Sequence, residues 1–245
     1  MLRALDWQRV TILNTDTVFA KDLANEFRRL WVGDYNGEVK HSDTIRINAD
    51  GSANETSIQQ VLKSVPRKDA TSNSRIIFLS AHSQHAFPIL QQAHESGFQP
   101  DTVWIGPSSW IGRHESPTND FSWLPEHPGY LGVSVFRNRD DTFDTFMNHL
   151  NAYRLDRGRS ALKELPPFAA ETVDSIRAMT WALVNAPNRQ DGKAVVETLR
   201  GVDFAGVSGR VQLTETGDRL NPQYSLFNAQ QGPDSDGNIV WELWV

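Results

Sequence analysis

The sequence predicts an α/β fold in which a parallel sheet is covered by helices on both faces. Five short runs have the apolar, β-branched composition of strands: residues 9–13, 44–48, 75–80, 102–106 and 130–136. Helical spacing of apolar residues fills three of the intervals: residues 19–31, 57–65 and 86–96. Strands and helices that alternate through short links are typical of a parallel sheet with helices on both sides.

Each element of this first part follows from its local composition. Residues 75–80 read Arg-Ile-Ile-Phe-Leu-Ser, and such an almost wholly apolar run is expected of a strand buried on both faces. The first helix follows a turn with capping residues, and its apolar side chains share one face: Phe19, Leu23, Phe27, Leu30 and Trp31. The second helix carries its own stripe: Ile58, Val61, Leu62 and Val65. Gly97 closes the third helix.

The second half of the chain is predicted to hold three helices and then a β-rich tail. The helices span residues 143–153, 167–183 and 192–199. In the tail, Gly206 and Gly209 mark a turn into a short strand, and Gly217 next to Asp218 closes a hairpin. Both kinds of residue tolerate the positive φ that tight turns require. The strands of the tail are expected at residues 211–213, 224–228 and 239–245.

Composition and motifs exclude several classes of function. The net charge is −6 and the Lys and Arg residues are scattered, which argues against a nucleic-acid surface. The chain has no cysteine, so disulfides, thiol catalysis and cysteine-based zinc sites are excluded. It also contains no Gly-x-Ser-x-Gly elbow, no Gly-rich phosphate loop and no His-Glu-x-x-His pair. We therefore expect a protein that is not an enzyme and that uses no cofactor or metal.

Targeting signals are sparse. The first residues contain no continuous apolar region, so no signal peptide is visible, and no run approaches the roughly 20 apolar residues of a membrane span. Asn54-Glu55-Thr56 fits an N-glycosylation acceptor, a triplet that often arises by chance.

Several landmarks occur in a fixed order along the chain: Asp6-Trp7, residues 16–19, 75–79, Gly97-Phe98, and residues 103–110, 168–183 and 204–218. Together they resemble the receptor family ligand-binding region, which has the periplasmic-binding-protein type I fold. That region is found in class C G-protein-coupled receptors, natriuretic-peptide receptors and ionotropic glutamate receptors. The resemblance implies a Rossmann-like sheet lobe flanked by helices, with returning lobe I helices and a C-terminal β-hairpin. It also implies a non-catalytic, small-ligand-binding receptor ectodomain on the extracellular face of a membrane, signalling by cleft closure.

The resemblance also implies a domain organisation. Family members place a whole βα lobe before the tryptophan that is Trp7 here, so we expect lobe II with most of lobe I absent. Residues 1–136 would form lobe II, 137–200 the hinge crossing and helices that pack on lobe I, and 201–245 the return to lobe II. The expected partners are a small-molecule ligand, the missing lobe I of the same receptor and a second receptor chain in a dimer, but not nucleic acid.

One helix would then lack the surface that it covers. The helix at 168–183 presents an apolar set meant for that missing surface: Phe168, Val173, Ile176, Met179, Ala182 and Leu183. An uncovered apolar face of this kind predicts dimerisation or poor solubility of the isolated chain.

Three loops at the carboxyl ends of strands are the expected ligand site. They supply Thr17 and Phe19, then Ser80, His82 and Ser83, then Ser108 and Ser109. Class C receptors often place an aromatic ring at the position of Phe19, and His82 suits a carboxylate. Glutamate-sensing relatives place an acid near Ser108, and serine supplies no charge for a ligand amine. The expected ligand is amino-acid-like or a small organic anion.

Structural interpretations remain open for the same residues. Phe19 also fits the first core residue of its helix, residues 82–85 fit a helix cap, and Trp110 fits a packing anchor. Asp174 and Asp218 are interpreted as structural, the first on a helix surface and the second in a turn. Two other functions stay open for the chain. One is a soluble solute-binding protein of a transport system, and the other is an α/β enzyme that uses His82 or Asp16.

Overall fold

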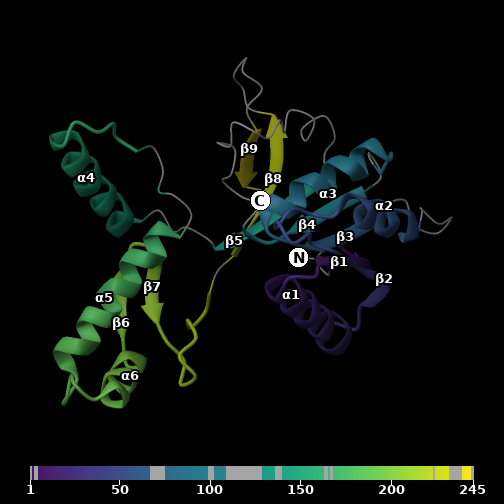
Figure 1. The fold of residues 1–245 in the computed structure, drawn as a ribbon. Coiled ribbons are helices and arrows are strands. Elements are labelled where there is room, and N and C mark those ends of the chain that lie inside the picture. Colours follow the sequence, from purple (N-terminus) through teal and green to yellow (C-terminus); the bar gives the residue numbers. More distant parts are fainter. Residues whose placement is uncertain are drawn as a thin grey trace. The chain divides into compact units, whose positions relative to one another are not determined.

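The computed structural model describes residues 2, 5–66, 75–98, 102–108, 129–135, 140–162, 165, 168–222, 224–231 and 239–243. The chain divides into two compact units, which Figure 1 shows as a ribbon. The first unit comprises Met1–Ser134 and Ser225–Val245, and the second comprises Val135–Tyr224. Each unit is described by itself below.

A seven-stranded sheet is the centre of the first unit. Its strands are β1 (Arg9–Thr15), β2 (Glu38–Ile45), β3 (Arg75–Ser80), β4 (Thr102–Gly106), β5 (Tyr130–Val135), β8 (Tyr224–Gln231) and β9 (Ile239–Leu243). They lie in the order β2-β1-β3-β4-β5-β8-β9. Neighbours from β2 to β5 are parallel, whereas β8 and β9 are antiparallel. The predicted α/β class with a mostly parallel sheet is confirmed.

Helices cover both faces of this sheet, with α1 (Val18–Arg29) on one side and α2 (Glu55–Ser64) and α3 (Ser83–Glu95) on the other (Figure 1). On the side of α2 and α3, the buried cluster includes Ile58, Leu79, Leu90 and Trp104. On the side of α1 it includes Ile12, Phe78 and Ile105, and Phe27 stacks on Phe78 with ring centroids 4.2 Å apart. The sheet is therefore buried on both faces, as the apolar composition of its central strands predicts.

The edge strand β2 lies several residues before its predicted position at 44–48. Its side chains alternate between exposed and half-buried until Ile45, which is fully buried. Glu38 forms ion pairs with Lys40 at 2.9 Å and Arg9 at 3.2 Å, and the hydrogen bond from Lys40 lowers the pKa of Glu38. An edge strand has only one neighbour and tolerates charge. Apolar composition therefore indicated only its buried end.

Helix α1 continues into one π-helical turn, η1 (Leu30–Asp34), that holds Trp31 against the chain that follows. Trp31 is 5% exposed, and its carbonyl oxygen accepts a hydrogen bond from the amide of Gly37 at 2.7 Å. A Cβ atom at Gly37 would overlap the indole ring of Trp31. Glycine is therefore required at this close approach.

The second unit combines three helices with a hairpin. The helices are α4 (Asp141–Asp156), α5 (Ala169–Asn185) and α6 (Gly192–Arg200), and the hairpin pairs β6 (Asp203–Gly206) with β7 (Gly209–Gln212). All three helices overlap their predicted ranges. On the hairpin, Arg210 donates to both carboxylate oxygens of Asp203, at 2.9 and 2.8 Å, and this hydrogen bonding lowers the pKa of Asp203.

The tail differs from its prediction in how the strands pair. The hairpin turn lies at Val207 and Ser208, and Gly209 has a φ of +94°. The predicted second turn is present: the amide of Thr214 donates to the carbonyl of Asp218 at 2.7 Å, and the hydroxyl of Thr216 donates to the carboxylate of Asp218 at 2.9 Å. Residues 201–224 belong to the second compact unit and residues 225–245 to the first.

A buried carboxylate joins α5 to this hairpin. Asp174 is 2% exposed, so the expectation that it lies on a helix surface was wrong. Its two oxygens accept hydrogen bonds from the amides of Val207 at 2.8 Å and Ser208 at 2.7 Å, and from the hydroxyl of Ser208. Arg219 donates to the hydroxyl oxygen of Ser208 at 2.8 Å and to its carbonyl at 3.0 Å. Asp174 thus satisfies the donors of the turn between β6 and β7.

Candidate functional site

The predicted site residues follow strands whose carboxyl ends lie along one edge of the sheet. Strand β3 lies between β1 and β4, and Asn14 of β1 is paired with Ser80 of β3. Thr17 and Phe19 come just after β1, and Ser108 comes just after β4. Because the three strands are parallel and adjacent, their exit loops share one edge, as ligand sites of α/β proteins do.

Two of the predicted site residues, Phe19 and His82, are in contact with each other at this edge. Their rings stack with centroids 4.4 Å apart and planes 19° apart. Phe19 is 42% exposed, and α1 buries Ala20 and Ala24 instead, so Phe19 is not a core residue. The pair forms an accessible, flat surface of one aromatic and one imidazole ring.

His82 occupies the N-cap position of α3, but its side chain makes no capping hydrogen bond. The backbone carbonyl of His82 accepts from the amides of His85 at 2.9 Å and Ala86 at 2.8 Å, so the main chain starts the helix. The imidazole is exposed and packs on Phe19. His82 therefore caps α3 through its main chain and not through its side chain.

Residues with hydroxyl groups lie close to Phe19 and His82 in the sequence, and their side chains have different roles in the structure. Thr17 caps α1, since its hydroxyl oxygen accepts from the amide of Ala20 at 3.4 Å, and it also shares a hydrogen bond with Thr15 at 3.2 Å. Ser83 is buried at the start of α3. Ser80 is fully buried, and its hydroxyl has no hydrogen-bond partner in the described part of the chain.

The third loop is described only at its beginning. Ser108 is half-buried in a short turn after β4, whereas Ser109 and Trp110 lie outside the described residues. The structure thus brings Phe19 and His82 into contact and places Thr17, Ser80, Ser83 and Ser108 at the ends of the same strands. None of these four hydroxyls has a recorded hydrogen bond to the ring pair within the described ranges.

A buried histidine beside this loop was not singled out by the sequence. His85 is 3% exposed, and its Nε2 atom forms a hydrogen bond with the carbonyl of Gly51 at 2.9 Å. It joins the start of α3 to the loop before α2. The loop after β1 is tied in the same way, because the carboxylate of Asp16 accepts from the amide of Ile47 at 3.0 Å. Both contacts fix the loops that carry the candidate site.

The described side chains contain one group that resembles hydrolytic machinery. Ser64 contacts His41 Nε2 at 3.2 Å and donates to Asp43 at 3.1 Å. Asp43 lies 4.0 Å from the same Nε2 atom. In an acyl-transfer triad the carboxylate binds the opposite ring nitrogen and orients the imidazole. This group therefore does not have the geometry of a triad.

Among the described residues, no group of three or more His, Cys, Asp or Glu side chains is arranged to hold a metal ion. None of the described helices combines the length and the apolar character that crossing a membrane requires.

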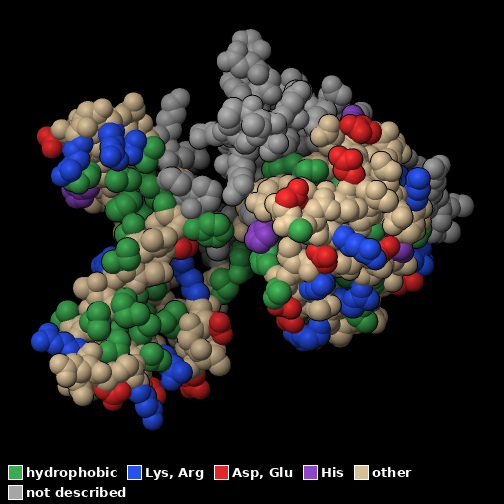
Figure 2. Space-filling model, in the orientation of Figure 1, with side chains coloured by type: hydrophobic (Ala, Val, Ile, Leu, Met, Phe, Trp, Pro, Cys, Tyr) green, Lys and Arg blue, Asp and Glu red, His purple; other side chains and the backbone are tan. Residues whose placement is uncertain are grey.

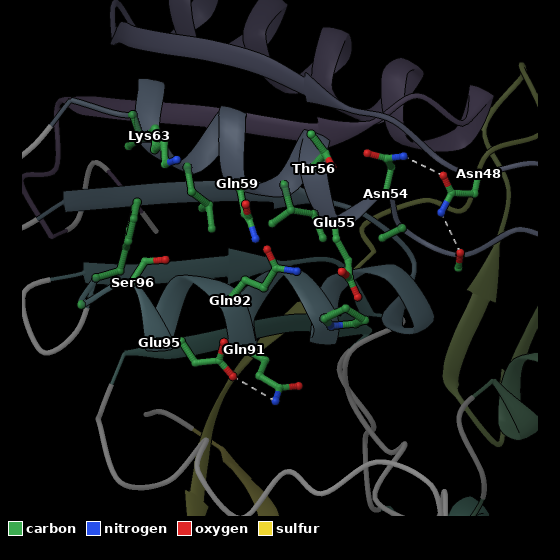
Figure 3. Close-up of a pocket in the computed structure, with 18 of the residues that line it drawn as sticks. Asn48, Asn54, Glu55, Thr56, Gln59, Lys63, Gln91, Gln92, Glu95 and Ser96 are labelled. Atoms are coloured by element: carbon green, nitrogen blue, oxygen red, sulfur yellow. Dashed lines mark hydrogen bonds between the residues drawn. The ribbon is translucent and has the colours of Figure 1, made fainter.

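A groove of about 1190 Å³ lies between α2 and α3 (Figure 3). Its lining combines the charged side chains of Glu55, Lys63, Arg75 and Glu95 with six carboxamides: Asn48, Asn54, Gln59, Gln84, Gln91 and Gln92. No sequence motif signals a groove, because its walls come from two helices far apart in the chain.

The fold and the strand-end site define a ligand-binding α/β protein of the periplasmic-binding-protein type I class. The chain belongs to the receptor family ligand-binding region, whose family model matches residues 1–232. Members are ligand-binding domains of the receptor or periplasmic-binding type and are generally non-catalytic. The resemblance seen in the sequence is therefore confirmed. No curated protein matches the chain.

Proposed function

We propose that this chain is the ligand-binding ectodomain portion of a cell-surface receptor that signals, without catalysis, by closing on a small ligand. Family membership supports ligand binding of the receptor type. The observation that carries the proposal is the exposed Phe19–His82 stack at the carboxyl ends of the adjacent parallel strands β1 and β3.

The chemistry of this edge suits a small molecule with a flat or apolar part and an anionic group. The ring of Phe19 offers a stacking face, and the imidazole of His82 offers an N–H donor that becomes cationic when protonated. We propose Thr17, Ser108 and Ser109 as further hydroxyl donors, whereas Ser80 and Ser83 are buried. A carboxylate ligand accepts hydrogen bonds from such donors. We propose an amino-acid-like ligand or a small organic anion.

An exposed apolar face on α5 supports the second half of the proposal. Ile176 is 64% exposed, and Phe168, Met179 and Leu183 are also exposed. Val173 is half-buried, and Ala182 is fully buried, so the expectation that Ala182 belongs to this face was wrong. Figure 2 shows hydrophobic side chains gathered over the unit that contains α5. We propose that the remaining lobe of the same receptor covers this face.

Ligand binding is expected to depend on the ring pair. Amino acids, γ-aminobutyrate and small organic anions would be screened by thermal shift with the complete receptor ectodomain, because a ligand at 100 times its Kd stabilises a protein by about 2.7 kcal/mol. We expect Phe19→Ala and His82→Ala each to weaken the ligand that is found by about three- to tenfold, the value of one stacking pair.

Two variants provide matched controls for this measurement. Tyr35→Ala removes an aromatic ring that is 50% exposed in the same unit, and His149→Ala removes an exposed imidazole from α4. Both are expected to bind like the parent. Equal affinity in all four variants would contradict a site at the Phe19–His82 stack.

The isolated chain is expected to self-associate through α5. We expect Ile176→Lys with Met179→Lys to lower the apparent mass by light scattering and to reduce binding of a dye specific for apolar surfaces, because the changes interrupt a contiguous apolar patch. Leu155→Lys, at a site 60% exposed on α4, is the control and should change neither signal. A monomeric parent chain that binds no dye would rule out self-association through α5.

A further inference from the structure

The groove between α2 and α3 contains polar groups that protein contacts do not fully satisfy. Gln59 of α2 and Gln92 of α3 point toward one another from opposite walls (Figure 3). The Oε1 atom of Gln92 is buried and has no hydrogen-bond partner among the described residues. Ile58 and Leu62 border the same groove but belong to the core, being 0% and 4% exposed. Carboxamides both donate and accept hydrogen bonds, so they suit a ligand rich in hydroxyl groups.

The triplet Asn54-Glu55-Thr56 lies at one end of this groove, and all three residues line it. Asn54 is the N-cap of α2: its Oδ1 atom accepts from the amide of Ser57 at 2.8 Å. Its Nδ2 atom donates one hydrogen bond, to Asn48 at 2.8 Å. The amide nitrogen carries two hydrogens, so one remains for substitution while the cap and the bond to Asn48 are kept.

We propose that Asn54 carries an N-linked glycan whose first sugars lie along the groove between α2 and α3. The inference rests on the proposed function, because only a chain that enters the secretory compartment meets the sugar donor. The sequence contains this triplet once, and the fold places it beside a carboxamide-lined groove. Hydroxyl groups of the sugar would form hydrogen bonds with the exposed carboxamide of Gln59, which lines the groove.

The attachment is a group transfer from a lipid-linked diphospho-oligosaccharide. The Nδ2 atom of Asn54 forms a bond to C1 of the first sugar, and the bond between C1 and the diphosphate oxygen breaks. The lipid diphosphate leaves with the electron pair of that bond, and the Nδ2 proton is lost to solvent or base. No oxidant or reductant is required.

Attachment is tested with the full chain, secreted from glycosylating eukaryotic cells behind an added leader. Intact mass before and after treatment with a glycan-releasing amidase should show one glycan on the parent and on Thr56→Ser. It should show none on Asn54→Gln or Thr56→Ala. Thr56→Ala keeps the Asn54 cap, so its loss of the glycan does not reflect loss of the cap. A secreted parent chain without sugar on Asn54 would overturn the proposal.

Contact with the groove is tested by the rate at which the amidase releases the glycan from the folded chain. Gln59→Ala should raise this rate by about three- to tenfold, because it removes a hydrogen bond that holds the sugar. Gln60→Ala, an exposed residue of α2 outside the groove, is the matched control and should leave the rate unchanged. Equal rates in both variants would overturn the groove contact.

The added leader keeps this test separate from the proposed receptor role. Secretion no longer depends on the natural location of the chain, so absence of the glycan reports on Asn54 itself. The ligand screen with Phe19→Ala and His82→Ala is independent of Asn54. A chain that binds its ligand but carries no sugar would refute only the present inference.

Discussion

Asp174→Ala is expected to destabilise the second unit by about 3 to 5 kcal/mol, because the buried turn between β6 and β7 loses the carboxylate that accepts its hydrogen bonds. The change leaves the amides of Val207 and Ser208 and the hydroxyl of Ser208 without their partner in a buried environment. The measurement is the free energy of unfolding from denaturant titration. Hydrogen exchange would then show whether the lost stability is that of β6 and β7.

A graded series separates the carboxylate from the rest of the turn. Ser208→Ala removes the hydroxyl that donates to Asp174 and accepts from Arg219, and it should cost about 1 to 2 kcal/mol. Asp218→Ala removes an exposed carboxylate from the next turn and should change hydrogen exchange at β6 and β7 little. If Asp174→Ala destabilised the unit no more than Asp218→Ala, Asp174 would not hold the hairpin to α5.

Gly37→Ala is expected to destabilise the first unit by about 2 to 3 kcal/mol, the range for overpacking a core that cannot relax. The new methyl group would overlap the indole ring of Trp31, which is held between α1 and the sheet. The ring cannot move away freely, because it also lies near Phe27, with centroids 6.3 Å apart. Denaturant unfolding monitored by tryptophan fluorescence would measure the change.

Gly33→Ala is the matched control for this experiment. Gly33 lies in the same π-helical turn, and a Cβ atom there would meet nothing within 4 Å. Alanine in a helical turn is favoured over glycine by roughly 0.5 to 1 kcal/mol, so this variant should be equal to or more stable than the parent. Equal losses in both variants would mean that helix geometry, and not the Trp31 contact, determines the effect.

Sequence reasoning succeeded where apolar residues are dense and periodic. The almost wholly apolar β3 and the stripe of α2 are both where they were expected. The predicted position of the edge strand β2 was several residues too late in the chain, because the polar residues at the start of this strand resemble a loop. Asp174 was misplaced because a lone carboxylate on a helix is usually solvated. The signal for the burial of Asp174 was its helical spacing from three small apolar residues that are buried on the same stripe of α5: Ala170, Ala178 and Ala182.

The sequence predicted the edge of the sheet at which the candidate site lies, but not which of its side chains are in contact. Strand exits after residues 13, 80 and 106 pointed to Thr17, His82 and Ser108. The contact between Phe19 and His82 depends on β1 lying beside β3, which the strand pattern alone does not determine. Whether an exposed ring meets another ring also depends on the angle at which α1 leaves β1, and no residue pattern encodes that angle.

The charged border strand β2 has a consequence for how copies of this molecule meet. Glu38 and Lys40 are exposed on it, and Glu38 is already engaged with Arg9 and Lys40. A second molecule that added its own strand there would strip water from these charges. The charge on β2 therefore disfavours the edge-to-edge strand pairing from which fibres grow.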